Sequence, residues 1–183
     1  MTSRSRLSTS VLLTCAAIGV ATGVLQVAAG VISVPVSATL PILYGLVLGV
    51  HVLPGVVAQE LLRAPWVALI THFVAALVAS AMTPPWIGRY IGTALLIGGL
   101  QELVAATSRY KQWQPWRFFV SAVVVGAVIA VAIWFAADVT RFPLWGQIFY
   151  VALFIAGPVA WTAVGLGIGR ALRRAGVPRR VHG

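Results

Sequence analysis

The stretch VLLTCAAIGVATGVLQVAAGVI, residues 11–32, decides the fold class of this protein. It contains no charged residue and is long enough to cross the hydrocarbon core of a bilayer as one helix, which needs about 20 residues. The rest of the chain is similar, since 60% of its 183 residues are hydrophobic, 9% are charged and the mean hydropathy is +0.98. Soluble domains carry roughly a quarter charged residues. The composition therefore predicts an integral membrane protein with no separate soluble catalytic domain.

Further apolar stretches follow, and turn-forming residues separate them. Ser33, Pro35, Ser37 and Pro41 divide the longest uncharged interval, because serine and proline are frequent in turns. Helix is expected throughout, since the strands of a membrane barrel would need polar residues at every second position. The sequence predicts a single all-α membrane domain of six spans, followed by a basic cytoplasmic tail over 170–183. The predicted spans are residues 11–32, 40–59, 65–81, 87–108, 116–137 and 144–168.

The basic residues predict the orientation of these spans, because positively charged loops stay in the cytoplasm. With both termini cytoplasmic, the outer side carries only Arg89 and Arg141 of the 13 Lys and Arg residues. The other eleven lie inside, and they explain the net charge of +10 as membrane topology and contact with anionic lipid. No nucleic-acid partner is expected. The eleven are Arg4, Arg6, Arg63, Arg109, Lys111, Arg117, Arg170, Arg173, Arg174, Arg179 and Arg180.

The first span is rich in small residues, which let helix backbones approach closely where lipid supplies no hydrophobic driving force. Ala17 and Ala21 form one pair at helical spacing, and Gly19 and Gly23 begin a second stripe that continues to Gln26 and Gly30. Two interpretations stay open. These faces either pack inside the chain's own bundle or bind a partner membrane subunit.

Ionisable residues within a span are costly and therefore mark candidate functional positions. His51, His72 and Glu102 are the three. At about 1.5 Å per residue, His72 and Glu102 both lie about 10 Å from the cytoplasmic ends of their spans. We expect these two residues to form one polar substrate site, with His51 as a further candidate. The alternative for each is a structural hydrogen bond.

Aromatic residues gather in the predicted outer half of the spans. Tyr44, Trp134 and Tyr150 are the candidates to wall a pocket for a flat ring or a cation, which aromatic faces attract. The alternative is that they are ordinary anchors at the membrane interface.

Several functions are disfavoured by what the sequence lacks. No G-x-x-x-x-G-K-[ST] phosphate-binding loop is present, so the chain is not expected to hydrolyse ATP. Cys15 is the only cysteine, which excludes an internal disulfide and a cysteine-based zinc site. We expect no enzymatic activity, no metal site and no cofactor.

Three segments and their order resemble one transporter family. These are RAPWVALITH at 63–72, TPPW at 83–86 and GGLQELV at 98–104, followed by Arg109, Tyr110 and Trp113. The pattern is similar to the YkoE-type S components of energy-coupling-factor (ECF) transporters, which are associated with thiamine or its hydroxymethylpyrimidine precursor. Two positions depart from it. Trp66 stands where glycine usually follows the proline, and His72 stands where a carboxylate is usual.

The resemblance implies six helices that hold a small vitamin-like substrate in the bundle. It also implies a transmembrane coupling subunit, contacted through small residues of the first helix such as Ala17 and Ala21, and two ATPase subunits that drive transport. Two other functions stay open. A proton-coupled carrier or channel would use His51, His72 and Glu102 as a relay, and a membrane assembly protein would use its glycine faces for packing alone.

The predicted topology can be tested by cysteine labelling. After replacement of Cys15, a cysteine at Ser37 or Thr140 should react with an impermeant thiol reagent added from outside. A cysteine at Ser108 should not react, because the charge distribution places it inside. The opposite labelling pattern would reverse the orientation.

Overall fold

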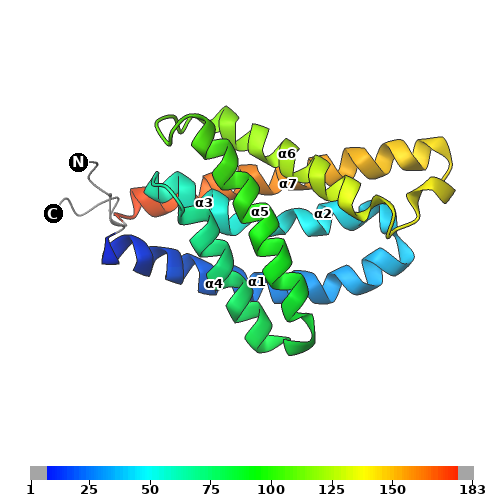
Figure 1. The fold of residues 1–183 in the computed structure, drawn as a ribbon, viewed down its shortest axis with the longest axis horizontal. Coiled ribbons are helices and arrows are strands. Elements are labelled where there is room, and N and C mark those ends of the chain that lie inside the picture. The colour runs from blue at the N-terminus through cyan, green and yellow to red at the C-terminus, as the bar shows by residue number, and fades with distance from the viewer. Residues whose placement is uncertain (1–7, 177–183) are drawn as a thin grey trace.

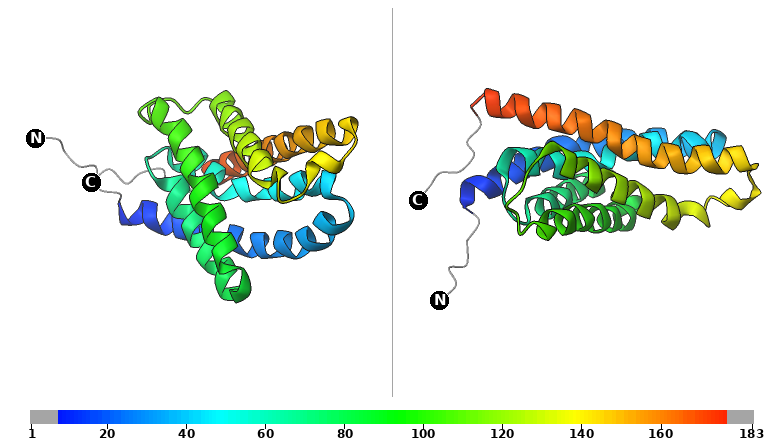
Figure 2. Two further views of the ribbon diagram at one scale, coloured as in Figure 1. Left: turned by 45° about the vertical axis from the view of Figure 1, so that its right-hand side comes forward. Right: turned by 90° about the horizontal axis from the view of Figure 1, so that it is seen from above.

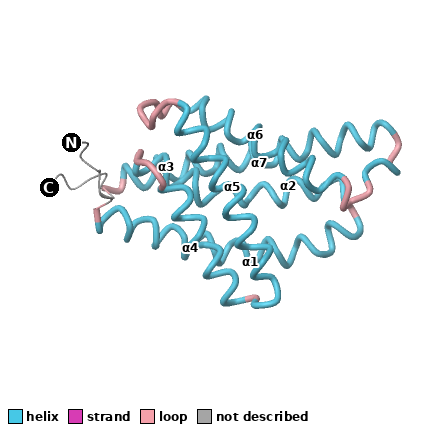
Figure 3. The backbone as a smooth tube through the Cα atoms, viewed as in Figure 1, coloured by secondary structure: helices cyan, strands magenta, loops and turns pink. Residues whose placement is uncertain are grey.

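The computed structural model describes residues 8–176, and all of its regular structure is helical. The α-helices are α1 (Thr9–Thr39), α2 (Tyr44–Leu48), α3 (Leu53–Leu62), α4 (Val67–Met82), α5 (Ile87–Thr107), α6 (Pro115–Trp134) and α7 (Leu144–Arg174). Short 3-10 turns are η1 (Pro41–Leu43), η2 (Gly49–Val52), η3 (Pro84–Trp86) and η4 (Val139–Arg141). The connections between helices are short (Figure 3). The prediction of an all-α membrane domain is confirmed.

Segments η1, α2, η2 and α3 follow one another without a break and form the second span, Pro41–Leu62. This segment and four others are long and apolar enough to cross a bilayer, and α4 is a shorter apolar helix of 16 residues. α1 begins and α7 ends at the same end of the bundle, which also holds the α3–α4 and α5–α6 connections (Figure 1). We call this the basic end, because Arg63, Arg109 and Arg174 lie in these segments.

Two predicted boundaries are wrong. α1 does not stop near residue 32 but continues through Pro35 to Thr39. A proline is tolerated inside a membrane helix, and the turn comes instead at Leu40, since the residue before a proline avoids the α conformation. At the other end of the chain, residues 170–174 of the predicted tail continue α7, and residues 177–183 lie outside the described residues.

The helices form an arrangement in which α7 and the α4–α5 hairpin lie on opposite sides of the molecule (Figure 2). The hairpin crosses the other helices obliquely instead of running parallel to them (Figure 1). α4 packs on α1, and α7 packs on α6 and along the second span.

Glycines set the distance between the second span and α7. A Cβ atom at Gly45 would lie 2.6 Å from the Phe154 Cα, and one at Gly49 would lie 2.7 Å from the Pro158 nitrogen. Gly157 faces Gly45 from the other side. The two backbones are therefore in direct contact, as in the small-residue interfaces of membrane helices. We call Gly45, Gly49 and Gly157 the glycine seam.

Gly157→Ala should destabilise the protein by about 1–3 kcal/mol, because the added methyl group must push two backbones apart. Gly167→Ala is the matched control, since Gly167 lies on the same helix and a Cβ atom added there would have no heavy atom of another segment within 4 Å. Thermal unfolding in detergent, followed by circular dichroism, measures both. Equal stability of the two variants would contradict the role of the seam.

Candidate functional site

The second span departs from α geometry at the point where it carries His51. Pro54 has no N–H to donate to the Val50 carbonyl, and the backbone of Leu53 donates to that carbonyl in a 3-10 turn instead. The Val52 carbonyl accepts a hydrogen bond from the Gln101 side chain of α5, at 3.0 Å. Irregular backbone at membrane depth is tolerated where protein groups satisfy it, and such turns are common at functional sites.

Polar side chains line the contact between the second span and the α4–α5 hairpin. At one end, Arg89 donates to the Tyr44 hydroxyl at 2.7 Å. Further along, the His72 imidazole Nε2 and the Gln101 Oε1 lie 2.8 Å apart, both buried. His51 lies in the second span between Tyr44, which Arg89 contacts, and Val52, which Gln101 contacts. It has 4% of its surface exposed. We call Tyr44, His51, His72, Arg89 and Gln101 the polar seam.

Hydrogen bonding determines which ring nitrogen of His72 carries the proton, but it does not determine this for His51. Because the Gln101 amide nitrogen donates to Val52, its oxygen must accept, and His72 Nε2 must therefore carry the hydrogen. The buried His51 Nδ1, in contrast, has no hydrogen-bond partner among the described residues. A buried polar atom without a partner is rare enough in folded proteins to require an explanation.

An aromatic cluster adjoins the polar seam at Tyr44. The Tyr44 ring meets the Phe154 ring edge-on at 5.9 Å, Phe154 lies 4.3 Å from Tyr150, and Tyr150 lies 5.7 Å from Trp134. The three aromatic residues expected at the site thus share one cluster, but Tyr150 is fully buried and is no interface anchor. Phe154 was not predicted, although its spacing of four residues from Tyr150 places both on one helix face.

Glu102 holds the start of α4. Its two carboxylate oxygens accept the backbone N–H groups of Trp66, at 3.0 Å, and Ala68, at 2.7 Å. An anion is favoured at a helix N-terminus, where N–H groups have no partner within the helix. Trp66 itself has a φ of 67°, the left-handed conformation that glycine adopts most easily. Trp66 is thus held in a backbone conformation that is unfavourable for a side chain of this size.

Tyr110, in the α5–α6 connection, completes the surroundings of this carboxylate. Burial raises the pKa of Tyr110 to about 12, and the nearby Glu102 charge and its hydrogen bond to the Tyr110 hydroxyl contribute to the increase. Tyr110 therefore remains a hydrogen-bond donor at every physiological pH.

Glu102 and His72 do not form the single polar site that we expected. Glu102 hydrogen-bonds to the start of α4, and His72 hydrogen-bonds to Gln101. The helical spacing predicts the same depth for both residues. It does not predict which groups each side chain contacts.

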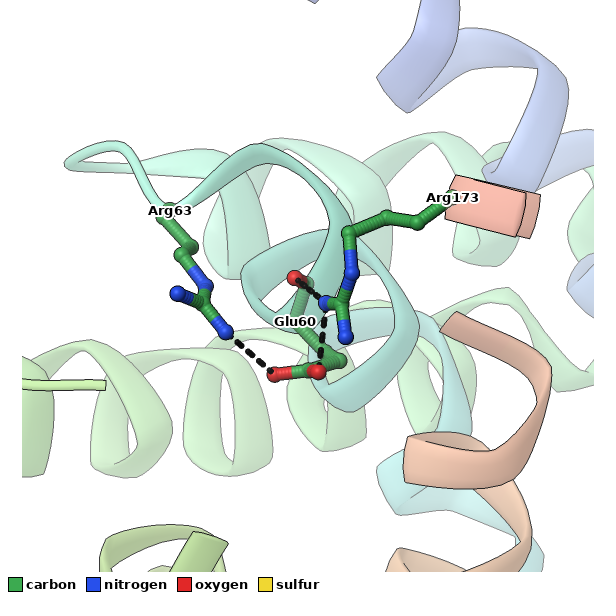
Figure 4. Close-up of polar contacts among 3 residues, drawn as sticks. All are labelled: Glu60, Arg63 and Arg173. Atoms are coloured by element: carbon green, nitrogen blue, oxygen red, sulfur yellow. Dashed lines mark hydrogen bonds and ion pairs between the residues drawn. The ribbon is translucent and has the colours of Figure 1, made fainter. Parts of the chain in front are cut away.

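The basic end holds a buried ion pair that the sequence does not predict. Arg173 of α7 contacts the carboxylate of Glu60 and donates to the Glu60 backbone carbonyl at 2.7 Å, and Arg63 lies 3.7 Å from the second carboxylate oxygen (Figure 4). Glu60 directly follows the last residue of the predicted span 40–59. The pair joins the end of α7 to the end of α3.

The two stripes of α1 have different environments. Gly19 and Gly23 are buried against α4, where a Cβ atom would lie 2.7 Å from Val74 and from the Ala75 carbonyl oxygen, respectively. They are not available to a partner, which corrects that expectation. Ala17 and Ala21, both exposed, line an apolar groove of about 470 Å³. α1, α3 and α7 form this groove, with Leu25, Val57, Leu61, Ile168 and Leu172 among its lining residues.

Comparisons with known proteins show the family of this chain and a solved structure with a similar fold. A family model described as "ABC-type cobalt transport system, permease component" matches residues 11–128. The chain belongs to this family. Its fold is similar to a solved structure described as "Crystal structure of an S-component of ECF transporter", with a TM-score of 0.84 and 16% sequence identity over 94% of this chain and 88% of that one. No curated protein matches the sequence.

This member of the cobalt-permease family is thus a multi-pass membrane protein, which in bacteria lies in the cell membrane. Within residues 8–176, no three His, Cys, Asp or Glu side chains gather as a metal site would require. Its polar seam and its aromatic cluster instead offer hydrogen bonds and ring faces.

Glu102→Gln should lower the free energy of unfolding by about 1.5–3 kcal/mol, because an amide cannot accept both charge-assisted bonds from α4. Asp138→Asn is the control, since Asp138 pairs with Arg141 at the surface, where such pairs contribute little. Thermal unfolding compares the two variants. A Glu102→Gln protein of normal stability that fails to bind substrate would instead make Glu102 a ligand-binding group.

Proposed function

We propose that this protein is the substrate-binding S component of an ECF-type importer. In this role it binds a small vitamin-like molecule between its helices and delivers it inward when two ATPase subunits act through a transmembrane coupling subunit. The likeness in fold to a solved S component supports the proposal. The sequence has no phosphate-binding loop, and this agrees with an importer in which other chains hydrolyse ATP.

The observation that carries the proposal is the apolar groove along α1, α3 and α7. Ala17 and Ala21 form its floor on α1, and side chains this small allow a partner helix to approach the backbone closely. The Glu60–Arg173 pair joins α3 to the last turn of α7 beside the groove, and so holds two of its walls together. A helix of the coupling subunit is the occupant that we assign to it.

The substrate site that we assign lies elsewhere, at the polar seam and the aromatic cluster. Aromatic faces at Tyr44, Trp134 and Tyr150 suit a flat heteroaromatic ring, and His51 and His72 suit its polar substituents. Thiamine and its hydroxymethylpyrimidine precursor, the molecules implied by the sequence resemblance, have rings of this kind. Glu102 supports this site indirectly by fixing the hairpin that carries His72 and Gln101.

Bulky side chains in the groove should separate docking from substrate binding. Ala17→Trp and Ala21→Trp should each abolish co-purification with the coupling subunit, because an indole would fill the space needed by a partner helix. Ligand binding by the isolated protein should stay nearly unchanged, since the polar seam lies on another side of the bundle. Mass spectrometry of the small molecules that co-purify with the wild-type protein identifies the substrate directly.

Val20→Trp is the matched control. Val20 has 49% of its surface exposed at the same depth of α1 but does not line the groove, so its substitution should leave the complex intact. A complex that survives both Ala17→Trp and Ala21→Trp would contradict docking at the groove.

A further inference from the structure

The positions of the acidic side chains limit the charge of the substrate. The chain has three acidic residues, Glu60, Glu102 and Asp138. Glu60 pairs with Arg173, Asp138 pairs with Arg141 at the surface, and Glu102 accepts two backbone N–H groups at the start of α4. Each carboxylate is therefore already engaged. None is left at the polar seam to balance a positive charge on a ligand.

The charge that does lie at the polar seam is positive. Arg89 donates to the Tyr44 hydroxyl, and its guanidinium lies over the Trp86 ring, 5.5 Å from the centroid. Neither contact supplies a negative charge. Close to a membrane interior the dielectric constant is low, and two like charges repel each other more strongly than they do in water.

His51 supplies a buried ring nitrogen at the polar seam that has no partner within the described part of the protein. Its side chain is buried on η2, and its Nδ1 makes no hydrogen bond to a described residue. Arg89 binds the hydroxyl of Tyr44, which lies seven residues before His51 in the same span, about two helical turns away. In a neutral imidazole Nδ1 is either an N–H donor or an acceptor, and a neutral ring that carries an amino or hydroxyl substituent can pair with it in either form.

We propose that His51, Tyr44 and Arg89 select an electrically neutral heteroaromatic ring over a cationic one. His51 hydrogen-bonds to the ring substituents, the Tyr44 ring packs against its face, and Arg89 disfavours a positive charge. This inference rests on the proposed function, because it assigns the substrate class of the same site.

Two probes that share an aminopyrimidine ring test the proposal: thiamine, which is a cation, and its neutral hydroxymethylpyrimidine precursor. Titration calorimetry with the full chain in detergent should show the neutral probe binding at least tenfold more tightly. Arg89→Gln should reduce the ratio of the two dissociation constants, thiamine over the neutral probe, several-fold. Arg89→Lys, which keeps the charge, should preserve this ratio. Arg141→Gln is the matched control, since it removes the other arginine predicted to lie outside, which already pairs with Asp138.

The contribution of His51 has its own readout. His51→Ala should weaken binding of the neutral probe about tenfold or more, the loss expected for a buried hydrogen bond of about 1.4 kcal/mol. His51→Gln, which keeps a donor and an acceptor, should recover part of it. Circular dichroism confirms that each variant is folded.

Three results would overturn the inference. Thiamine binding as tightly as the neutral probe, or a ratio that Arg89→Gln leaves unchanged, would refute the charge selection while leaving the S-component function intact, since a ligand still binds. Binding of neither probe would refute both the inference and the pyrimidine substrate. The co-purification test with Ala17→Trp and Ala21→Trp would then still test the S-component role, because it does not depend on the substrate.

Discussion

The structure depends on the direct backbone contact between the second span and α7. Lipid offers no hydrophobic driving force for helix association, so the stability of the pair comes from van der Waals contact between closely spaced backbones. Only glycine permits this spacing at Gly45, Gly49 and Gly157. The same contact holds the irregular η2 turn against α7 and therefore fixes the position of His51. Packing and the candidate site thus rest on one constraint.

Two further contacts hold the other elements around this pair. Glu102 fixes the start of α4, although Arg63 and Trp66 just before it both have positive φ angles. Glu60 joins the second span to the end of α7 through Arg173. Both carboxylates lie near the basic end, so the negative charges of the bundle serve its architecture, and the polar seam is left with Arg89, tyrosine, histidine and amide groups. With Glu60 and Glu102 bound to Arg173 and to the start of α4, and Asp138 paired at the surface, the groups of the polar seam offer hydrogen bonds and no negative charge.

The proposed docking groove and the proposed substrate site lie on different sides of the molecule. The apolar groove of α1, α3 and α7 is open, whereas His51, His72 and Gln101 of the polar seam are buried. α1 contacts both regions through different faces, since Gly19 and Gly23 pack on the hairpin helix α4 and Ala17 and Ala21 line the groove. A partner bound in the groove would therefore contact the same helix, α1, that packs against the hairpin.

The sequence by itself determined the membrane class, the helical fold and the candidate residues, because hydropathy and the cost of a buried charge are properties of short segments. It could not determine which residues meet. The partner of Glu102 is the backbone at the start of α4, whereas its neighbour Gln101 binds His72 of α4 and Val52 of the second span. The packing of these three segments against one another decides which groups meet. Likewise, the two stripes of α1 have similar composition, and only the rotation of the helix in the bundle buries the glycines and turns the alanines to the groove. Such rotations follow from contacts between distant segments, and these exist only in the tertiary structure.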